Sequence, residues 1–153
     1  MLGSRFFFRR KVVESLIEID KNERLIAVTP IGYAVKSLSV EERLMTGFGL
    51  THMRKSLANL VTGIGEEEWP QWVKLALEAA RLAPSAVNRQ PWRFDIKPSG
   101  ITVSVNINKR EYGISKRLCC GIAMLHIEVA ALNFEIQGYW EFLKQPQVAK
   151  YNF

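Results

Sequence analysis

The chain has 153 residues, of which 48% are apolar and 24% are charged, with 21 Lys and Arg against 15 Asp and Glu. This length and composition exclude disordered and collagen-like proteins, because such a chain can build a core without metals or disulfides. The net charge of +6 suits phosphate-bearing ligands. Since the basic residues are dispersed and no apolar run is long enough to cross a bilayer, we predict neither a nucleic-acid-binding nor a membrane protein.

Cysteine and histidine usage argues against a metal centre. The two cysteines, Cys119 and Cys120, are neighbours and lack the separated-pair spacing of a zinc site or redox motif. The two histidines, His52 and His126, are far apart in the sequence, so we predict no metal site. Buried, reduced cysteines acting as small hydrophobic residues fit a cytoplasmic protein. No repeat or shift in composition divides the chain, and we expect a single domain over residues 1–153.

The first third of the chain gives short apolar patterns. Apolar residues at helical spacing predict a helix over residues 6–19, followed by a polar turn at residues 20–23. Residues 24–29 are β-branched and apolar and end at Pro30, which favours a short buried strand. After an irregular stretch, we predict a helix over residues 51–61.

The remaining elements have clearer patterns. Gly63-Ile64-Gly65 predicts a linker, and Pro70 suits the first turn of an amphipathic helix that ends near Leu82. Apolar and polar residues alternate over residues 92–96 and 101–107, around a Pro-Ser-Gly turn, which predicts an antiparallel hairpin with one polar face. Residues 117–136 have little polar character and predict a helix buried on most sides or lying in a subunit interface. A closing strand is expected over residues 139–143.

The loop between the amphipathic helix and the hairpin carries most of the candidate chemistry. Pro84 and Pro91 prevent it from being a helix or a central strand. Ser85, Asn88 and Gln90 supply hydrogen-bonding groups, and side-chain amides both donate and accept, as the mixed edge of a flavin pyrimidine ring requires. The alternative is that these residues only form turns, which Pro, Ser and Asn commonly do.

Three stretches resemble the FMN-dependent nitroreductases. Residues 80–94, ARLAPSAVNRQPWRF, are similar to the signature loop of that family. Residues 120–126, CGIAMLH, with the following AAL and GYW, are similar to its long central helix and next strand. Residues 28–33, VTPIGY, and residues 54–57, RKSL, resemble the members in which two halves are fused into one chain as a pseudo-dimer.

The resemblance implies an α+β fold, with an antiparallel-containing sheet packed by helices and a long buried central helix. It implies an oxidoreductase in which FMN lies between two subunits or fused halves, takes electrons from NADH or NADPH and passes them to a small acceptor. Because the flavin carries the chemistry, no catalytic side chain is expected. The flavin contacts implied are Pro84, Ser85, Ala86, Asn88 and Gln90.

The start of the chain departs from the family pattern. Family chains usually open with an Arg-rich segment containing a serine that clamps the FMN phosphate, whereas this chain opens with Arg9-Arg10-Lys11. Its sequence resembles the second half of the fused-type chains. We therefore expect a homodimer, or a pairing with a complementary half. The alternative is a structural or regulatory half-domain of the same fold that binds no flavin alone.

Overall fold

The computed structural model describes residues 12, 15–23, 31–33, 53–107 and 115–153. The chain divides into two compact units, Met1–Phe48 and Gly49–Phe153. The described part of the first unit contains the turn predicted at residues 20–23, where the Glu23 N–H donates to the Asp20 carbonyl at 2.9 Å. The predicted strand at residues 24–29 lies outside the described residues.

The helix predicted over residues 6–19 is wrong at its described end, because residues 15–19 form a turn and irregular backbone. There the Ser15 hydroxyl donates to the Val12 carbonyl at 2.7 Å, a local bond that competes with helical pairing. The rest of that stretch, apart from Val12, lies outside the described residues.

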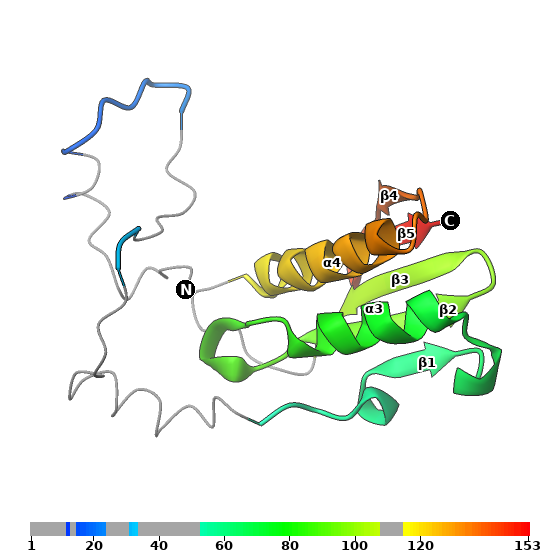
Figure 1. The fold of residues 1–153 in the computed structure, drawn as a ribbon. Helices are drawn as coiled ribbons and strands as arrows, with labels where there is room; N and C mark the ends of the chain where they lie inside the picture. Colours follow the sequence, from blue (N-terminus) through cyan, green and yellow to red (C-terminus); the bar gives the residue numbers. More distant parts are fainter. Residues whose placement is uncertain (1–11, 13–14, 24–30, 34–52, 108–114) are drawn as a thin grey trace. The chain divides into compact units, whose positions relative to one another are not determined.

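The second unit is a five-stranded sheet covered on one face by two helices (Figure 1). The strand order is β1-β2-β3-β5-β4, with β1 parallel to β2 and the other pairs antiparallel. The strands are β1 (Val61–Gly63), β2 (Trp92–Lys97), β3 (Gly100–Val105), β4 (Tyr139–Phe142) and β5 (Gln147–Asn152). The helices are α3 (Gln71–Leu82) and α4 (Lys116–Asn133), with short 3₁₀ turns η1 (Leu57–Asn59), η2 (Glu66–Glu68) and η3 (Ala86–Asn88). The α+β prediction is confirmed.

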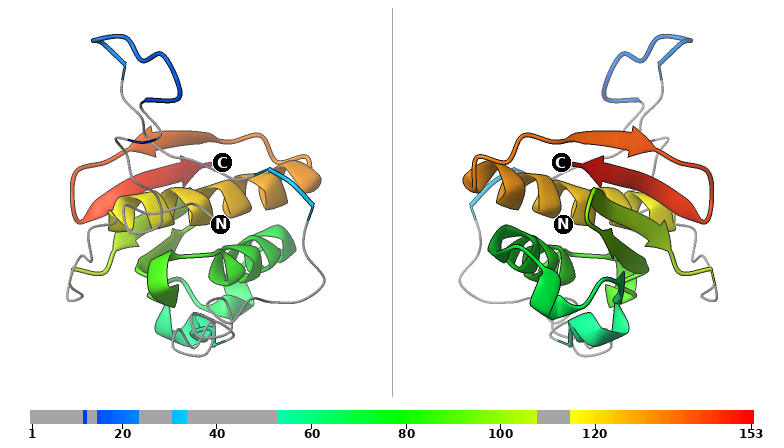
Figure 2. Two further views of the ribbon diagram at one scale, coloured as in Figure 1. Left: turned by 90° about the vertical axis from the view of Figure 1, so that its left-hand side faces the viewer. Right: turned by 90° about the vertical axis from the view of Figure 1, so that its right-hand side faces the viewer.

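The hairpin, the two long helices and the closing strand confirm the sequence patterns within a few residues. Two strands were not predicted: β1 is only three residues long, and β5 is inserted between β3 and β4 (Figure 2). The helix predicted over residues 51–61 is wrong. Residues 53–56 have no regular structure. The Leu60 carbonyl accepts from the Phe94 N–H at 2.9 Å, so the end of that stretch pairs with β2.

The core lies between the helices and the sheet. On α3, Val73, Ala76, Leu77 and Ala80 form a buried stripe at helical spacing. Two other apolar residues of this helix, Leu75 and Leu82, are about half exposed. Facing this stripe, the buried side chains Trp92, Phe94 and Ile96 alternate along β2 with less buried polar ones. Two core residues of α4, Cys120 and Ile127, are fully buried.

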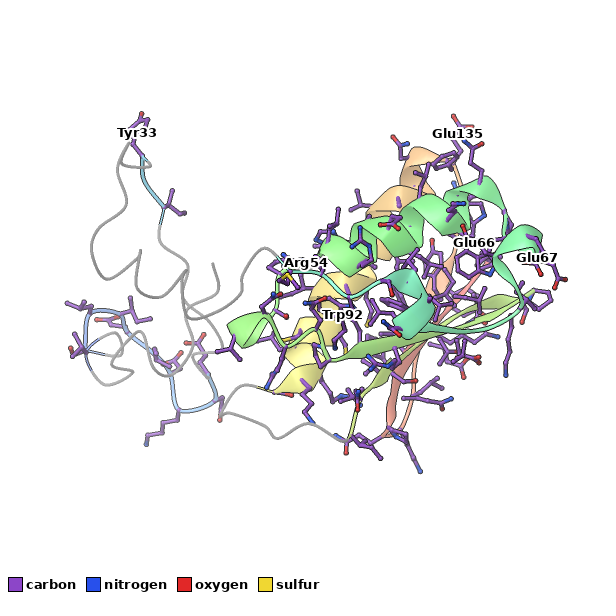
Figure 3. The ribbon with its side chains drawn as sticks, turned by 90° about the horizontal axis from the view of Figure 1, so that it is seen from below. Tyr33, Arg54, Glu66, Glu67, Trp92 and Glu135 are labelled. Atoms are coloured by element: carbon purple, nitrogen blue, oxygen red, sulfur yellow. The ribbon has the colours of Figure 1, made fainter. Side chains whose placement is uncertain are left out.

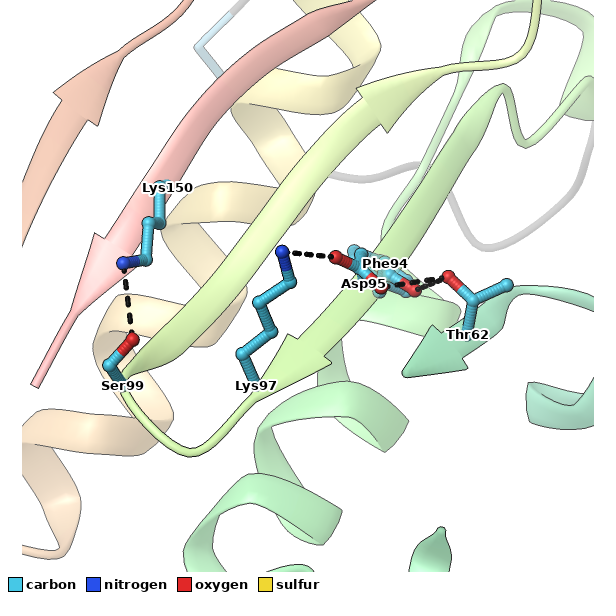
Figure 4. Close-up of polar contacts among 6 residues, drawn as sticks. All are labelled: Thr62, Phe94, Asp95, Lys97, Ser99 and Lys150. Carbon is cyan, nitrogen blue, oxygen red and sulfur yellow. Dashed lines mark hydrogen bonds and ion pairs between the residues drawn. The ribbon is translucent and has the colours of Figure 1, made fainter. Parts of the chain in front are cut away.

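The opposite face of the sheet is polar, as the alternation of the hairpin predicted. The Thr62 hydroxyl donates to Asp95 at 3.2 Å, and the Lys97 ammonium lies 3.7 Å from the same carboxylate (Figure 4). Lys150 on β5 donates to Ser99 in the hairpin turn at 3.3 Å. No helix in the described part of the chain is both long and apolar enough to cross a membrane.

Gly63 permits the close approach of β1 to β2. Its φ of +103° is rarely adopted by residues with a side chain, and a Cβ there would overlap the carbonyl oxygen of Ile96. We expect Gly63→Ala to lower the free energy of unfolding by about 2 kcal/mol or more, measured by urea denaturation. Gly65→Ala is the matched control, because Gly65 has a φ of −65° and its Cβ would meet only the flexible Glu67 side chain. Equal effects of the two substitutions would contradict this account.

Candidate functional site

The loop between α3 and β2 is folded on itself. Pro84 follows the end of α3, and η3 then turns the chain toward Pro91 at the start of the sheet. The hydroxyl oxygen of Ser85 accepts a hydrogen bond from the backbone N–H of Gln90 at 3.0 Å. This bond closes the loop across five residues and gives it a defined shape.

Three residues of the loop have left-handed backbone conformations. The φ values are 46° at Val87, 50° at Asn88 and 44° at Gln90. Asn tolerates this region, but a β-branched residue such as Val87 does so only under strain. Val87 is also 69% exposed, so its own side-chain packing does not compensate. Strain of this kind persists where surrounding contacts hold the backbone, and it is concentrated at functional sites.

Those contacts come from residues 53–55, which lie against the loop. The Asn88 amide donates to the Met53 carbonyl at 2.8 Å, and the Gln90 amide donates to the same oxygen at 3.0 Å. In return, the Lys55 backbone N–H donates to the side-chain oxygen of Gln90 at 2.8 Å. The two amides also join each other, with the Gln90 nitrogen 3.1 Å from the Asn88 oxygen. We call this set of bonds the amide clamp.

The side chains of Arg54 and Lys55 bring two positive charges into contact with the loop. The Arg54 guanidinium donates to the side-chain oxygen of Asn88 at 3.0 Å. Figure 3 labels Arg54 on the segment that precedes β1. The Lys55 ammonium donates to the carbonyl oxygens of Gln90 and Arg89, at 2.7 and 3.2 Å. Arg89, a third cation, is only 6% exposed and approaches the sulfur of Cys119 on α4 at 3.7 Å. The loop is therefore surrounded by positive charge.

The five residues that the sequence singled out differ in exposure. Pro84 is exposed, Ser85, Ala86 and Asn88 are half-buried, and Gln90 is 4% exposed. The structure brings all five together within one loop. The amides of Asn88 and Gln90 bond within the protein, and Ala86 packs against the core, whereas Pro84 and Val87 are exposed.

Arg54 and Lys55 are the neighbours that sequence reasoning did not assign to the site. The tripeptide Arg54-Lys55-Ser56 is the signal that could have found them, because it combines basic residues with a serine, as a phosphate clamp requires. The family pattern places such a segment at the start of its chains, and we interpreted residues 51–61 of this chain as a helix. The parallel pairing of β1 with β2 brings the tripeptide to the loop instead.

The two thiols of α4 are structural features of the core. Cys119 is 2% exposed and Cys120 is fully buried. Burial raises the pKa of the Cys120 thiol from 9.0 to about 12, and the nearby Cys119 raises it too, while Arg117 and Arg89 act in the opposite direction. A thiol with this pKa is protonated at neutral pH and is a poor nucleophile. Among the described residues, no group of three or more His, Cys, Asp or Glu side chains could hold a metal ion.

Comparison with known proteins identifies the family. A sequence profile of the family described as "Putative TM nitroreductase" matches residues 4–131. The chain belongs to this nitroreductase family. A crystal structure from Thermotoga maritima, described as a "putative nitroreductase", has a similar fold, with a TM-score of 0.52 and 22% sequence identity. That match covers 65% of this chain and 42% of the other, so it spans less than half of the Thermotoga protein. No curated protein matches the chain.

The raised pKa of Cys120 makes stability depend on pH in the alkaline range. The unfolded thiol loses its proton near pH 9.0, whereas the folded one keeps it up to about pH 12. Unfolding therefore releases a proton between these values, and the free energy of unfolding falls as the pH rises. We expect Cys120 to account for about 1 kcal/mol of the loss between roughly pH 8 and pH 10.

Urea denaturation at the two pH values checks this, with Cys120→Ala as the comparison. The variant should lose less stability than the wild type over the same pH range, whatever its stability at the lower pH. An identical loss in both proteins would show that Cys120 ionises equally in the folded and unfolded chains.

Proposed function

We propose that this chain is a flavin-dependent oxidoreductase that binds FMN, accepts electrons from NADH or NADPH and passes them to a small acceptor. The observation that carries the proposal is the convergence of Arg54 and Lys55 on the loop that resembles the family's flavin loop. A phosphate monoester carries close to two negative charges at neutral pH, and Arg and Lys are its usual partners in proteins. Reduced cysteines in the core are compatible with the cytoplasmic location that we include in the proposal.

The donors of the loop fit the flavin ring. Within the described part of the chain, the backbone N–H groups of Ala86 and Val87 donate no hydrogen bond, which leaves them for a ligand. The Ser85 hydroxyl accepts from Gln90, and within the described part of the chain it donates to no acceptor. These groups suit the oxygen and nitrogen atoms on the edge of the pyrimidine ring. In this proposal Pro84, Ser85 and Ala86 contact the flavin, and Asn88 and Gln90 complete the site.

In this arrangement the cofactor and the protein have different functions. Bound FMN supplies the electron-transfer chemistry, and the protein binds and orients it. Arg54 and Lys55 fix the phosphate end, while the loop donates hydrogen bonds to the ring end. The proposal requires neither a catalytic thiol nor an acid–base pair, in keeping with the protonated, buried state of Cys120.

We also propose that two copies of the chain associate through α4. Leu118, Leu125, Val129 and Leu132 lie along one side of this helix and are 44–58% exposed, with the half-buried Glu128 at the edge of that side. Gly121 lies on the same side with open space around it, so another helix could approach closely. The match to 42% of a longer relative supports a second copy as the occupant, since that relative contains more than twice the matched length.

An absorption spectrum tests the flavin proposal. The purified protein is mixed with FMN, freed of excess, and then treated anaerobically with NADH or NADPH. We expect a retained flavin band that bleaches on reduction, and an FMN affinity about tenfold lower for Arg54→Gln, because one charge-assisted contact is lost. Lys74→Gln, on the exposed side of α3, removes the same charge and should change little. A colourless wild-type protein would instead support the non-catalytic half-domain.

Sedimentation velocity tests the association. We expect a dimer at micromolar concentration and a shift toward monomer for Leu125→Glu, because a buried, unpaired charge opposes an apolar interface. Ile107→Glu is the control, since Ile107 is 71% exposed and lies outside α4. A monomeric wild-type protein, or equal effects of the two variants, would refute association through α4.

A further inference from the structure

We infer that Asn88 and Gln90 are positioning residues, which hold Arg54 and Lys55 against the loop so that the two ends of the binding site form together. This inference rests on the proposed flavin function for its ligand. It differs from the sequence-based expectation in one respect, because it assigns the two amides to the protein segment 53–55 and not to direct contact with the ring.

The geometry of Gln90 supports this role. Its side chain is 4% exposed, and its oxygen and nitrogen both have partners in residues 53–55. An amide used in this way fixes the backbone of Met53 and Lys55 on either side of Arg54. A primary amide is suited to the task because it donates and accepts at once, whereas a carboxylate only accepts.

Asn88 supports the cation directly. Its oxygen accepts from the Arg54 guanidinium at 3.0 Å, and its nitrogen donates to the Met53 carbonyl at 2.8 Å. The side chain therefore orients Arg54 through two neighbouring bonds, one to the guanidinium and one to the preceding carbonyl. Removing it frees a long side chain that would have to be ordered again when a ligand binds.

Lys55 completes the arrangement from the other side. Its ammonium donates to the carbonyl oxygens of Arg89 and Gln90, so the charge is placed by the loop backbone itself. This backbone is held in a left-handed conformation at Gln90. A change at Gln90 therefore reaches Lys55 by two routes, the side-chain bond to its N–H and the backbone carbonyl that its ammonium contacts.

A comparison of FMN with riboflavin tests the inference, because riboflavin has the ring but lacks the phosphate. For Gln90→Ala we expect an FMN affinity about tenfold lower and a smaller loss, about threefold, for riboflavin, because the loop that contacts the ring also loses part of its support. In the Lys55→Ala background, the same substitution should have a smaller further effect on FMN binding, because only the positioning of Arg54 is then left to lose. Equal losses for the two flavins, or additive effects of the two substitutions, would overturn the inference.

A second measurement does not depend on flavin. Trypsin cleaves after Arg54 and Lys55, and the clamp should protect both bonds in the native protein. We expect cleavage there to be about tenfold faster in Gln90→Ala and in Asn88→Gly, with cleavage after the exposed Lys144, between β4 and β5, unchanged as the internal control. Unchanged cleavage after residues 54 and 55 would refute the clamp.

The two measurements separate the inference from the proposed function. If the wild-type protein binds neither flavin, the flavin proposal fails, and the trypsin experiment still decides whether the amides hold residues 53–55. If flavin binds but the variants lose both flavins equally, the function stands and the positioning role fails. The Asn88→Gly substitution, at a half-buried residue whose φ of 50° glycine adopts without strain, keeps the test decisive should Gln90→Ala not fold.

Discussion

The parallel pairing of β1 with β2 is the constraint on which the candidate site depends. In a parallel pair both strands run in the same direction, so the residues that precede them lie at the same end of the sheet. Val61 pairs with Phe94, which places the segment before β1 beside the loop before β2. Two stretches more than 30 residues apart in sequence thereby contribute to one candidate site, with Arg54 and Lys55 on one and the loop from Pro84 to Gln90 on the other.

The same constraint explains the use of polar side chains inside the loop. Backbone groups next to a sheet end take hydrogen-bond partners from side chains or from water. Residues 53–56 have no regular structure of their own, and the side chains of Asn88 and Gln90 supply the missing partners. A left-handed backbone at Val87 and Asn88 accompanies this arrangement. The loop is thus shaped by its neighbour as much as by its own sequence.

Sequence reasoning succeeded where the pattern is local. The hairpin of β2 and β3 and the helix α3 have uninterrupted periodicity, and the structure places them within a few residues of the prediction. The sequence did not predict β1, because the three residues Val61-Thr62-Gly63 are too few to show an alternating pattern. Leu57 and Leu60 are three residues apart, which is also the spacing of a helix, and this favoured the incorrect helix prediction. Sequence reasoning also missed β5, whose place between β3 and β4 depends on contacts distant in sequence.

The candidate site divides in the same way. The loop from Pro84 to Gln90 could be found because its prolines and amides are contiguous, and because it resembles a long family motif. Arg54 and Lys55 could not be assigned from spacing, since their distance from the loop is set by the pairing of β1, which the sequence did not indicate. A local motif thus revealed half of the site, and sheet topology supplied the other half.

This topology also links folding to binding. The edge strand β1 is short, and it is joined to the sheet through few backbone bonds and through the amide clamp. A ligand that contacts both the cations and the loop binds only while β1 is paired with β2. It therefore stabilises that pairing by an amount that grows with the logarithm of its concentration relative to its dissociation constant. Because the loop alone lacks Arg54 and Lys55, the complete site exists only in the folded sheet.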